Sequence, residues 1–343
     1  MPVSFLRKSV APLLTILLAA MLLSACGTSD NAASPSPSAS PTPSQTESPA
    51  AAESASPAAS EPTMRAYKDA FDRTVDIPAA PQRIIAHYYA AEMKALDVPI
   101  AGTNFINAKL ALTEEQLQGV EDIGGEALVP NLEKTLSLEP DLIIVPDFLQ
   151  PADIEALSKI APTVVVAYGA DVFTRLKVLA DLIGQPEKAD HWVADYEAKA
   201  AEKRQLLQSS IEEGETAAAF ILHSDKQFYV YNKQRLGPTL YDAFGFAVPP
   251  KVAELFADKP NDLWAPISLE MLSDYVGDRV FLVAQSNTEE AKKATEELIE
   301  GPVWKNLPAV KSGKAYVVKS RWAMNDPLTL DWLLDEMVAL LAP

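Results

Sequence analysis

Short apolar runs alternate with segments of helical composition from residue 64 to the end of the chain. Runs of three to six residues rich in Ile and Val, most of them followed by a helical segment, are typical of α/β proteins with mainly parallel strands. The predicted strands lie at residues 83–86, 100–102, 142–145, 163–166, 217–222, 280–283 and 315–318. The predicted helices lie at residues 90–96, 131–136, 151–159, 240–244, 269–272, 289–300 and 328–341. The pattern therefore predicts two successive α/β halves.

A longer helical segment separates the two halves. Residues 185–213 contain no Gly and no Pro after Pro186, and Gly214 follows them. Pro suits the first turn of a helix and Gly suits its end, so the segment predicts one helix. At ~1.5 Å per residue this helix is ~40 Å long. It is expected to join an N-terminal lobe at 64–184 to a C-terminal lobe at 214–343.

A short repeat suggests that the two lobes are built alike. The triplet Asn-Leu-Glu at 131–133 precedes Asp141 by the same interval at which Ser-Leu-Glu at 268–270 precedes Asp278. Each Asp leads into a predicted strand. The shared order of helix, loop and strand predicts lobes of similar construction.

The chain begins with the features of a secretory signal. Two basic residues precede an apolar run at about 10–23, which is short for a transmembrane helix. The ending Leu-Ser-Ala-Cys at 23–26 resembles the bacterial lipobox, and Cys26 is the only cysteine of the chain. We predict a lipoprotein signal peptide at 1–25 and, at 26–63, a lipidated Cys26 followed by a disordered tether of Ser, Pro and Ala. The alternative is a plain signal peptide with a coincidental cysteine.

Charge and composition exclude several classes of function. The chain has 29 Lys and Arg against 47 Asp and Glu, a net charge of −18, and no basic patch, which excludes a nucleic-acid partner. One cysteine excludes an intrachain disulfide, and three histidines exclude most His-rich metal sites. The sequence has no Gly-x-Ser-x-Gly elbow, no His-Glu-x-x-His motif and no glycine-rich phosphate loop, which argues against an extracellular hydrolase.

A series of loose motifs in fixed order resembles the siderophore and cobalamin class of periplasmic-type substrate-binding proteins. The motifs lie at residues 81–85, 92–102, 131–144, 161–164, 267–270, 277–280, 304–311 and 326–328. The resemblance implies two Rossmann-like α/β lobes joined by a single long helix, with a ligand cleft between the lobes. It also implies a monomer that binds its ligand and catalyses no reaction.

The same resemblance implies a place in the cell and a partner. Such a receptor delivers its ligand to an ABC permease of two membrane subunits with its ATPase. A lipid on Cys26 is expected to hold it at the extracellular face of the membrane of a Gram-positive bacterium. In the family one exposed glutamate on each lobe docks onto the permease, and the matching positions are Glu133 and Glu270. An adhesive surface lipoprotein is the alternative from another class.

The candidate ligand contacts follow the predicted strands. In open α/β sheets ligands bind beyond the carboxyl ends of the strands, and these positions are rich here in aromatic, His and Arg residues. The predicted contacts are His87, Tyr88, Tyr89, Tyr168, His223, Arg321 and Trp322, to which the resemblance adds Trp264. Asp147 and Phe148 also follow a strand, Arg175 and Arg235 are candidate cations of the cleft or of the surface, and His191 is expected on the surface of the connecting helix.

These side chains suit a ferric siderophore, which brings its iron already wrapped by oxygen donors. The protein then needs no intrinsic cofactor and no metal ligands of its own. The few cations favour a hydroxamate or citrate–hydroxamate ligand over a catecholate. Only His87 and His223 are placed for a bare metal, which needs three or four ligands. Haem is the main alternative, with Tyr88, Tyr89 or His87 opposite His223 as axial ligands, and cobalamin is a weaker one.

Overall fold

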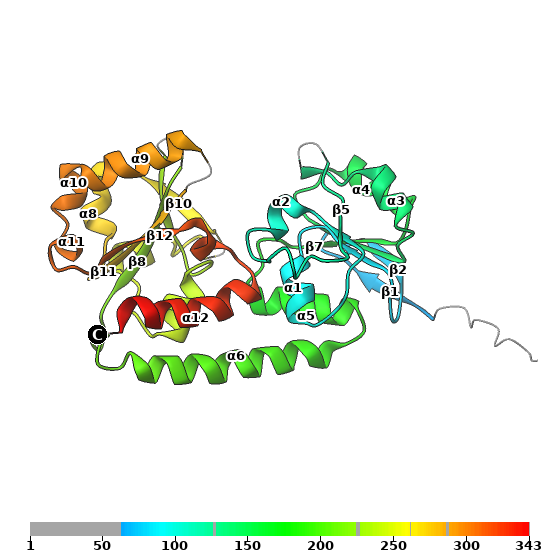
Figure 1. Cartoon of the computed structure of the whole chain (residues 1–343), viewed down its shortest axis with the longest axis horizontal. Coiled ribbons are helices and arrows are strands. Elements are labelled where there is room, and N and C mark those ends of the chain that lie inside the picture. Colours follow the sequence, from blue (N-terminus) through cyan, green and yellow to red (C-terminus); the bar gives the residue numbers. More distant parts are fainter. Residues whose placement is uncertain (1–62, 126–127, 224–226, 261, 286–287, 343) are drawn as a thin grey trace, which may run out of the picture. The chain divides into compact units, whose positions relative to one another are not determined.

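The computed structural model describes residues 63–125, 128–223, 227–260, 262–285 and 288–342 (Figure 1). The predicted signal peptide, Cys26 and all of the predicted tether except its last residue lie outside these ranges. In the part of the chain that is described, no helix is long and apolar enough to cross a bilayer.

The N-terminal lobe is built on a five-stranded parallel sheet. In spatial order its strands are β5 (Glu121–Asp122), β4 (Gly102–Thr103), β3 (Ile84–Ala86), β6 (Leu142–Pro146) and β7 (Thr163–Val166). Its helices are α1 (Ala90–Ala95), α2 (Phe105–Ala108), α3 (Leu132–Ser137), α4 (Pro151–Ser158) and α5 (Val172–Leu182). A separate antiparallel hairpin, β1 (Met64–Lys68) and β2 (Thr74–Pro78), precedes the sheet.

The N-terminal sheet is buried on both faces, which explains its continuous apolar strands. Leu142 and Ile144 of β6 pack with α1 and α5 in one core, whereas Ile143 and Val145 pack with α4 in another. This alternation is the twofold period of a strand applied to a sheet with a core on each side.

The C-terminal lobe has a mixed five-stranded sheet. In spatial order its strands are β10 (Trp264–Ile267), β9 (Phe228–Tyr231), β8 (Ala217–Leu222), β11 (Arg279–Ala284) and β12 (Ala315–Lys319). Strands β8, β11 and β12 are parallel, whereas β9 and β10 are each antiparallel to their neighbour. The helices are the π-helix η2 (Pro238–Ala243), α7 (Pro250–Leu255), η3 (Leu269–Met271), α8 (Leu272–Tyr275), α9 (Glu289–Glu300), α10 (Pro302–Lys305), α11 (Pro308–Lys311), η4 (Ser320–Ala323) and α12 (Pro327–Leu341).

Helix α6 (Pro186–Leu206) leads from the first lobe to the second and packs on α5 and α12 (Figure 1). It has 21 residues, and the prediction of a helix through residue 213 was too long. At ~1.5 Å per residue α6 is ~31 Å long. It ends because Leu207 turns into the core of the C-terminal lobe, where it is fully buried, and because the carbonyl of Ser210 accepts a hydrogen bond from Arg279 (2.8 Å).

The predicted α/β class is confirmed, and all seven predicted strands are present with shifts of at most two residues. Strands β1, β2, β5, β9 and β10 were not predicted, and Trp264, which lies outside every predicted strand, begins β10. Pro266 lies within β10, although a proline in a sequence segment normally argues against a strand there. It is tolerated because β10 is the edge of the sheet.

The short repeat corresponds to a shared structural device. The Asp141 carboxylate accepts hydrogen bonds from the backbone N–H groups of Gln82 and Arg83, just before β3 (2.6 and 2.9 Å). The Asp278 carboxylate accepts one from the backbone N–H of Thr216, just before β8 (2.9 Å). In each lobe an aspartate before one parallel strand therefore fixes the start of the neighbouring strand.

Candidate ligand-binding site

Three aromatic side chains meet at the carboxyl edge of the N-terminal sheet. Tyr88 follows β3, Phe148 follows β6 and Tyr168 follows β7. Their ring centroids are 5.1 Å apart for Tyr88 and Phe148, 5.9 Å for Tyr88 and Tyr168, and 5.5 Å for Phe148 and Tyr168, all in edge-to-face geometry. Phe148 is exposed and both tyrosines are half-buried. We call this group the N-lobe wall.

A hydrogen bond fixes the backbone at Tyr168, and burial keeps the Tyr88 hydroxyl protonated. The Asp147 carboxylate accepts a hydrogen bond from the backbone N–H of Tyr168 (3.1 Å), which fixes the chain after β7. Burial, with a smaller effect of Tyr168, raises the pKa of Tyr88 to about 12. The Tyr88 hydroxyl is therefore protonated at neutral pH and available as a hydrogen-bond donor.

Two neighbours of Tyr88 were expected at the ligand, and the structure places them inside the lobe instead. Tyr89 is fully buried, and its hydroxyl donates to the carbonyl of Val166 (2.9 Å). His87 is also fully buried, and neither of its ring nitrogens has a hydrogen-bond partner among the described residues. This burial lowers the pKa of His87 to about 4. We therefore leave His87 and Tyr89 out of the N-lobe wall.

The C-terminal lobe carries a second aromatic group on β8, β9 and β10. His223 follows β8, and its ring lies 5.0 Å from that of Tyr229 and 5.7 Å from that of Trp264. The guanidinium carbon of Arg235 lies 5.2 Å from the centre of the Trp264 ring, in cation–π contact. Arg235 also has a φ of 59°, a left-handed conformation that is strained for this residue type.

A second cation, Arg321, stands in η4 directly after β12. Its guanidinium carbon lies 4.2 Å from the centre of the Trp332 ring. In the described part of the chain the Nε atoms of Arg235 and Arg321 are buried and have no hydrogen-bond partner, and Nε2 of His223 is in the same condition. Buried polar atoms of this kind call for a hydrogen-bond partner. We call His223, Tyr229, Trp264, Arg235 and Arg321 the C-lobe wall.

Three further sequence candidates lie elsewhere. Trp322 was expected to contact ligand, but it is buried in the C-terminal core and stacks on Phe281, with ring centroids 6.2 Å apart. Arg175 is buried in an ion pair with Glu92. His191 is exposed on α6, as predicted.

The sequence interpretation missed Tyr229 and left Arg235 undecided. Tyr229 lies in β9, which was not predicted, and Arg235 lies in the turn that follows this strand. The run of aromatic and β-branched residues Phe-Tyr-Val-Tyr at 228–231 is the signal that favours a strand. On that strand Tyr229 lies on the face of Trp264, which places it beside His223.

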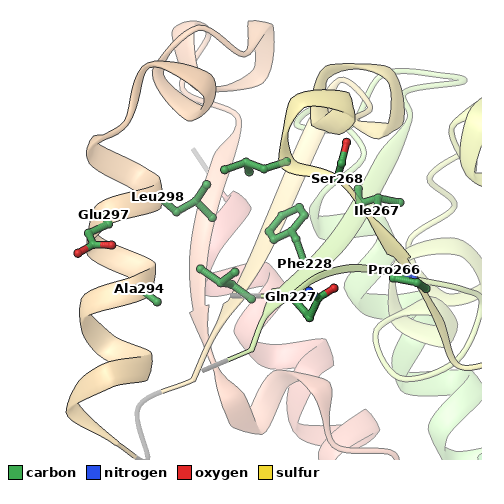
Figure 2. A pocket seen from close by; sticks show the side chains of 10 residues that line it. Gln227, Phe228, Pro266, Ile267, Ser268, Ala294, Glu297 and Leu298 are labelled. Atoms are coloured by element: carbon green, nitrogen blue, oxygen red, sulfur yellow. The ribbon is translucent and has the colours of Figure 1, made fainter. Parts of the chain in front are cut away.

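A cavity of about 610 Å³ is lined by residues that belong to neither wall. Helix α9 forms one side of it, and β9, β10 and the start of η3 form the other (Figure 2). Its lining is mainly apolar, with Phe228, Ile267 and Leu298 among the contributors, and none of the predicted ligand contacts belongs to it. The chemistry of the strand ends therefore identifies the candidate site, and the size of the cavity does not.

The two predicted docking glutamates are both exposed. Glu133 lies in the first turn of α3 and Glu270 lies in η3. Exposed apolar side chains flank each of them: Leu132 and Leu136 in the first lobe, Leu269 and Met271 in the second. Among the described residues, no cluster of three or more His, Cys, Asp or Glu side chains is placed to hold a metal ion.

Two α/β lobes with aromatic and cationic strand ends define a class of substrate-binding proteins, and comparison with known proteins specifies the family. Residues 115–322 match the periplasmic binding protein family model, and the chain belongs to that family. It is a substrate-binding protein rather than an enzyme, as predicted.

The matched relatives cover nearly the whole folded part. The chain is 27% identical to the iron(3+)-hydroxamate-binding protein YxeB of Bacillus subtilis, over 91% of this chain and 89% of that protein. It is 32% identical to the iron(3+)-hydroxamate-binding protein FhuD of the same organism, over 76% and 81%. The structure of FhuD2 from Staphylococcus aureus with bound ferrioxamine B matches with a TM-score of 0.64 at 29% identity, over 76% of this chain and 97% of that one. Two more distant Bacillus subtilis relatives are lipoproteins by name.

Proposed function

We propose that the protein binds a ferric hydroxamate siderophore in a one-to-one complex and delivers it to an ABC importer. The observation that carries the proposal is the pair of buried, unpartnered guanidinium Nε atoms of Arg235 and Arg321, each held over a tryptophan ring. The relatives named for ferric hydroxamates, and the one that holds ferrioxamine B, support the same ligand class.

The chemistry of the two walls suits such a ligand. A ferric hydroxamate presents carbonyl and hydroxamate oxygens around an iron ion that it has already coordinated, so the iron is cargo and needs no protein ligand. Arg235 and Arg321 supply donors to these oxygens. Tyr88 and Tyr168 supply rings for the organic chain and hydroxyls as neutral donors. The ligand is proposed to lie between the two walls.

A fluorescence titration tests this function. The C-lobe wall contains Trp264, and Trp332 lies under Arg321, so a bound iron complex should quench tryptophan emission. We expect saturable one-to-one quenching by ferrioxamine B. The panel includes ferric citrate, haem and cobalamin. Saturation by haem alone with a shift of its Soret band would replace the proposal with the haem alternative, and no response to any iron complex would contradict it.

Delivery is proposed to use one carboxylate on each lobe. Glu133 and Glu270 are exposed and occupy matching places in the short repeat, which suits a permease of two subunits. We also propose that Cys26 is lipidated and holds the protein at the extracellular face of the membrane. Mass spectrometry of the mature N-terminus tests the anchor, because a diacylglyceryl group on Cys26 is expected and an unmodified Cys26 would contradict it.

A further inference from the structure

A buried arginine, Arg175, contacts the N-lobe wall and the segment that carries Arg321 of the C-lobe wall. Arg175 of α5 is 1% exposed. Its Nε and Nη2 atoms lie 2.8 and 2.7 Å from the Glu92 carboxylate, which is 2% exposed. Its Nη1 donates to the carbonyls of Tyr168 (2.9 Å) and Ala170 (3.1 Å), just after β7. Its Nη2 also donates to the carbonyl of Asn325, in the C-terminal part of the chain.

The Asn325 contact reaches the segment that carries the cation of the C-lobe wall. Residues 321–325 run from Arg321 through η4 to the start of α12. Arg235 donates from Nη1 to the carbonyl of Ala323 in this segment (2.6 Å). Two guanidinium groups, one from each lobe, therefore bind the backbone of the same five residues.

In the N-terminal lobe, Arg175 contacts a residue of the N-lobe wall directly. The Tyr168 carbonyl accepts from Arg175, and the Tyr168 N–H donates to Asp147. The Arg175 guanidinium carbon also lies 5.8 Å from the centre of the Tyr168 ring. Tyr168 is thus fixed through its N–H, its carbonyl and its ring, and two of these contacts come from Arg175.

Stability alone does not account for this pair. A buried ion pair costs as much in lost hydration as it returns, and an apolar replacement of similar volume is often equally stable. An apolar pair lacks the planar guanidinium group, whose N–H donors bind several carbonyls in fixed directions. The hydrogen bonds of Arg175 beyond Glu92 all go to backbone carbonyls in this way.

We propose that Arg175 is a positioning residue that sets the separation of the N-lobe wall from the C-lobe wall. Its guanidinium holds Tyr168 and the Arg321 segment in one arrangement before ligand arrives, with Glu92 supplying the balancing charge. The ligand part of this inference rests on the proposed function; the separation of the walls is measurable without ligand.

The test replaces both partners, so that neither member of the pair is left buried without the other. Glu92→Met/Arg175→Met is compared with Glu215→Met/Arg279→Met, a matched control. Glu215 and Arg279 form another buried ion pair, 5% and 4% exposed, and its hydrogen-bond partners are not wall residues. Both double variants are expected to keep a thermal midpoint within ~5 °C of the parent.

Only the Arg175 variant is expected to change the site. Spin labels at Glu155→Cys and Glu296→Cys, exposed positions on α4 and α9, report the distance between the lobes in a Cys26→Ala background. We expect a broader distance distribution without ligand and ~10-fold or more weaker ferrioxamine B binding, because preorganisation is lost. The control pair should keep the parental distribution and affinity.

Two results would overturn the inference: a parental distance distribution in Glu92→Met/Arg175→Met, or an equal loss of affinity in the control pair. If Glu92→Met/Arg175→Met fails to fold, Arg175→Lys replaces it, since it keeps the charge and removes the fork. The same broadening is expected there, and its absence counts against the inference. A parent that binds no iron complex defeats the proposed function alone, because the distance distributions still decide the role of Arg175.

Discussion

The two walls occupy the same place in their lobes, at the ends of sheet strands, but they carry different chemistry. The N-lobe wall consists of three rings, and the arginine behind it is fully engaged with Glu92 and backbone carbonyls. The C-lobe wall places Arg235 and Arg321 over tryptophan rings with donors to spare. The comparison indicates a division of roles: one lobe supplies neutral surface and hydroxyls, and the other supplies positive charge.

This division matches the proposed binding of an oxygen-rich ligand by an acidic protein. The chain has a net charge of −18, so its general field does not attract anions. The positive charge of the C-lobe wall comes from two guanidinium groups, each over a tryptophan ring. Binding is therefore expected to depend on a few directional contacts and only weakly on ionic strength.

The largest expected effect comes from removing the charge of the C-lobe wall. Arg235→Ala/Arg321→Ala should weaken ferrioxamine B binding by about 100-fold or more, since hydrogen bonds to charged groups contribute ~1.5–3 kcal/mol each. Fluorescence titration measures the change. Lys233→Ala removes an exposed cation close in sequence and serves as the control. Equal affinities of the double variant and the control would show that the cations do not hold the ligand.

The two histidines that follow β3 and β8 sharpen the comparison, because only His223 belongs to a wall. The folded-state pKa of His87 is about 4, below its unfolded value of 6.5, because burial disfavours the charged ring. The contribution of the neutral His87 ring to the free energy of unfolding is therefore complete above pH 6.5. It is lost as the pH falls toward 4, because the unfolded state binds the proton at a higher pH than the folded state does. At ~1.4 kcal/mol per pH unit this amounts to about 3 kcal/mol.

Replacing His87 by Leu should remove this part of the fall in unfolding free energy at acid pH. Denaturant unfolding at pH 7 and pH 4.5 measures the free energy of unfolding for the parent and for His87→Leu. Contributions of the carboxylates cancel in the difference between the two proteins. His191→Leu, at an exposed position, is the control and should keep the parental dependence. An unchanged pH dependence in His87→Leu would contradict the buried, neutral state of this ring.

A smaller effect is expected on the N-lobe wall, which offers rings rather than charge. Tyr88→Ala should weaken ferrioxamine B binding by roughly 10-fold, whereas Tyr88→Phe, which keeps the ring, should lose only a few-fold, because a neutral hydrogen bond contributes ~1 kcal/mol. Tyr89→Phe loses only an internal hydrogen bond to Val166 and should bind as the parent does. If Tyr89→Phe lost as much affinity for ferrioxamine B as Tyr88→Ala, the assignment of the N-lobe wall would be wrong.

The smallest effect on binding in solution is expected at the docking carboxylates. Exposed ion pairs contribute about 1 kcal/mol or less, so Glu133 and Glu270 should set orientation on the permease more than affinity. Glu133→Ala/Glu270→Ala should keep parental affinity for ferrioxamine B and impair iron uptake by cells. Normal uptake, or weakened ligand binding, would contradict the docking assignment.

The sequence predicted the parallel strands of both sheets except the two-residue β5, because a strand buried on both faces appears as an uninterrupted apolar run, as at 142–145. It predicted the wall positions less well. Tyr88 and Tyr89 are adjacent after β3, and composition alone does not say which of them turns inward. That choice depends on α1 beginning at Ala90, which places Tyr89 at its N-cap and within reach of Val166.

The pattern of apolar and polar residues does not predict contacts between distant segments of the chain. The role of Arg175 depends on Asn325, which is 150 residues further along the chain. Arg235 depends on Trp264, which reaches it only because β10 pairs with β9. A short antiparallel edge strand that contains Pro266 has no strong period, so tertiary pairing decides it.

The most direct measurement of the two-wall account uses gallium(III) in place of iron in ferrioxamine B, which makes the complex diamagnetic. Nuclear Overhauser effects between ligand methylene protons and aromatic side chains then identify the walls of the bound state. The account predicts contacts from one bound ligand to Tyr88 and Tyr168 and also to Trp264. Contacts to Phe228 and the other side chains around the cavity of Figure 2, without contacts to either wall, would contradict it.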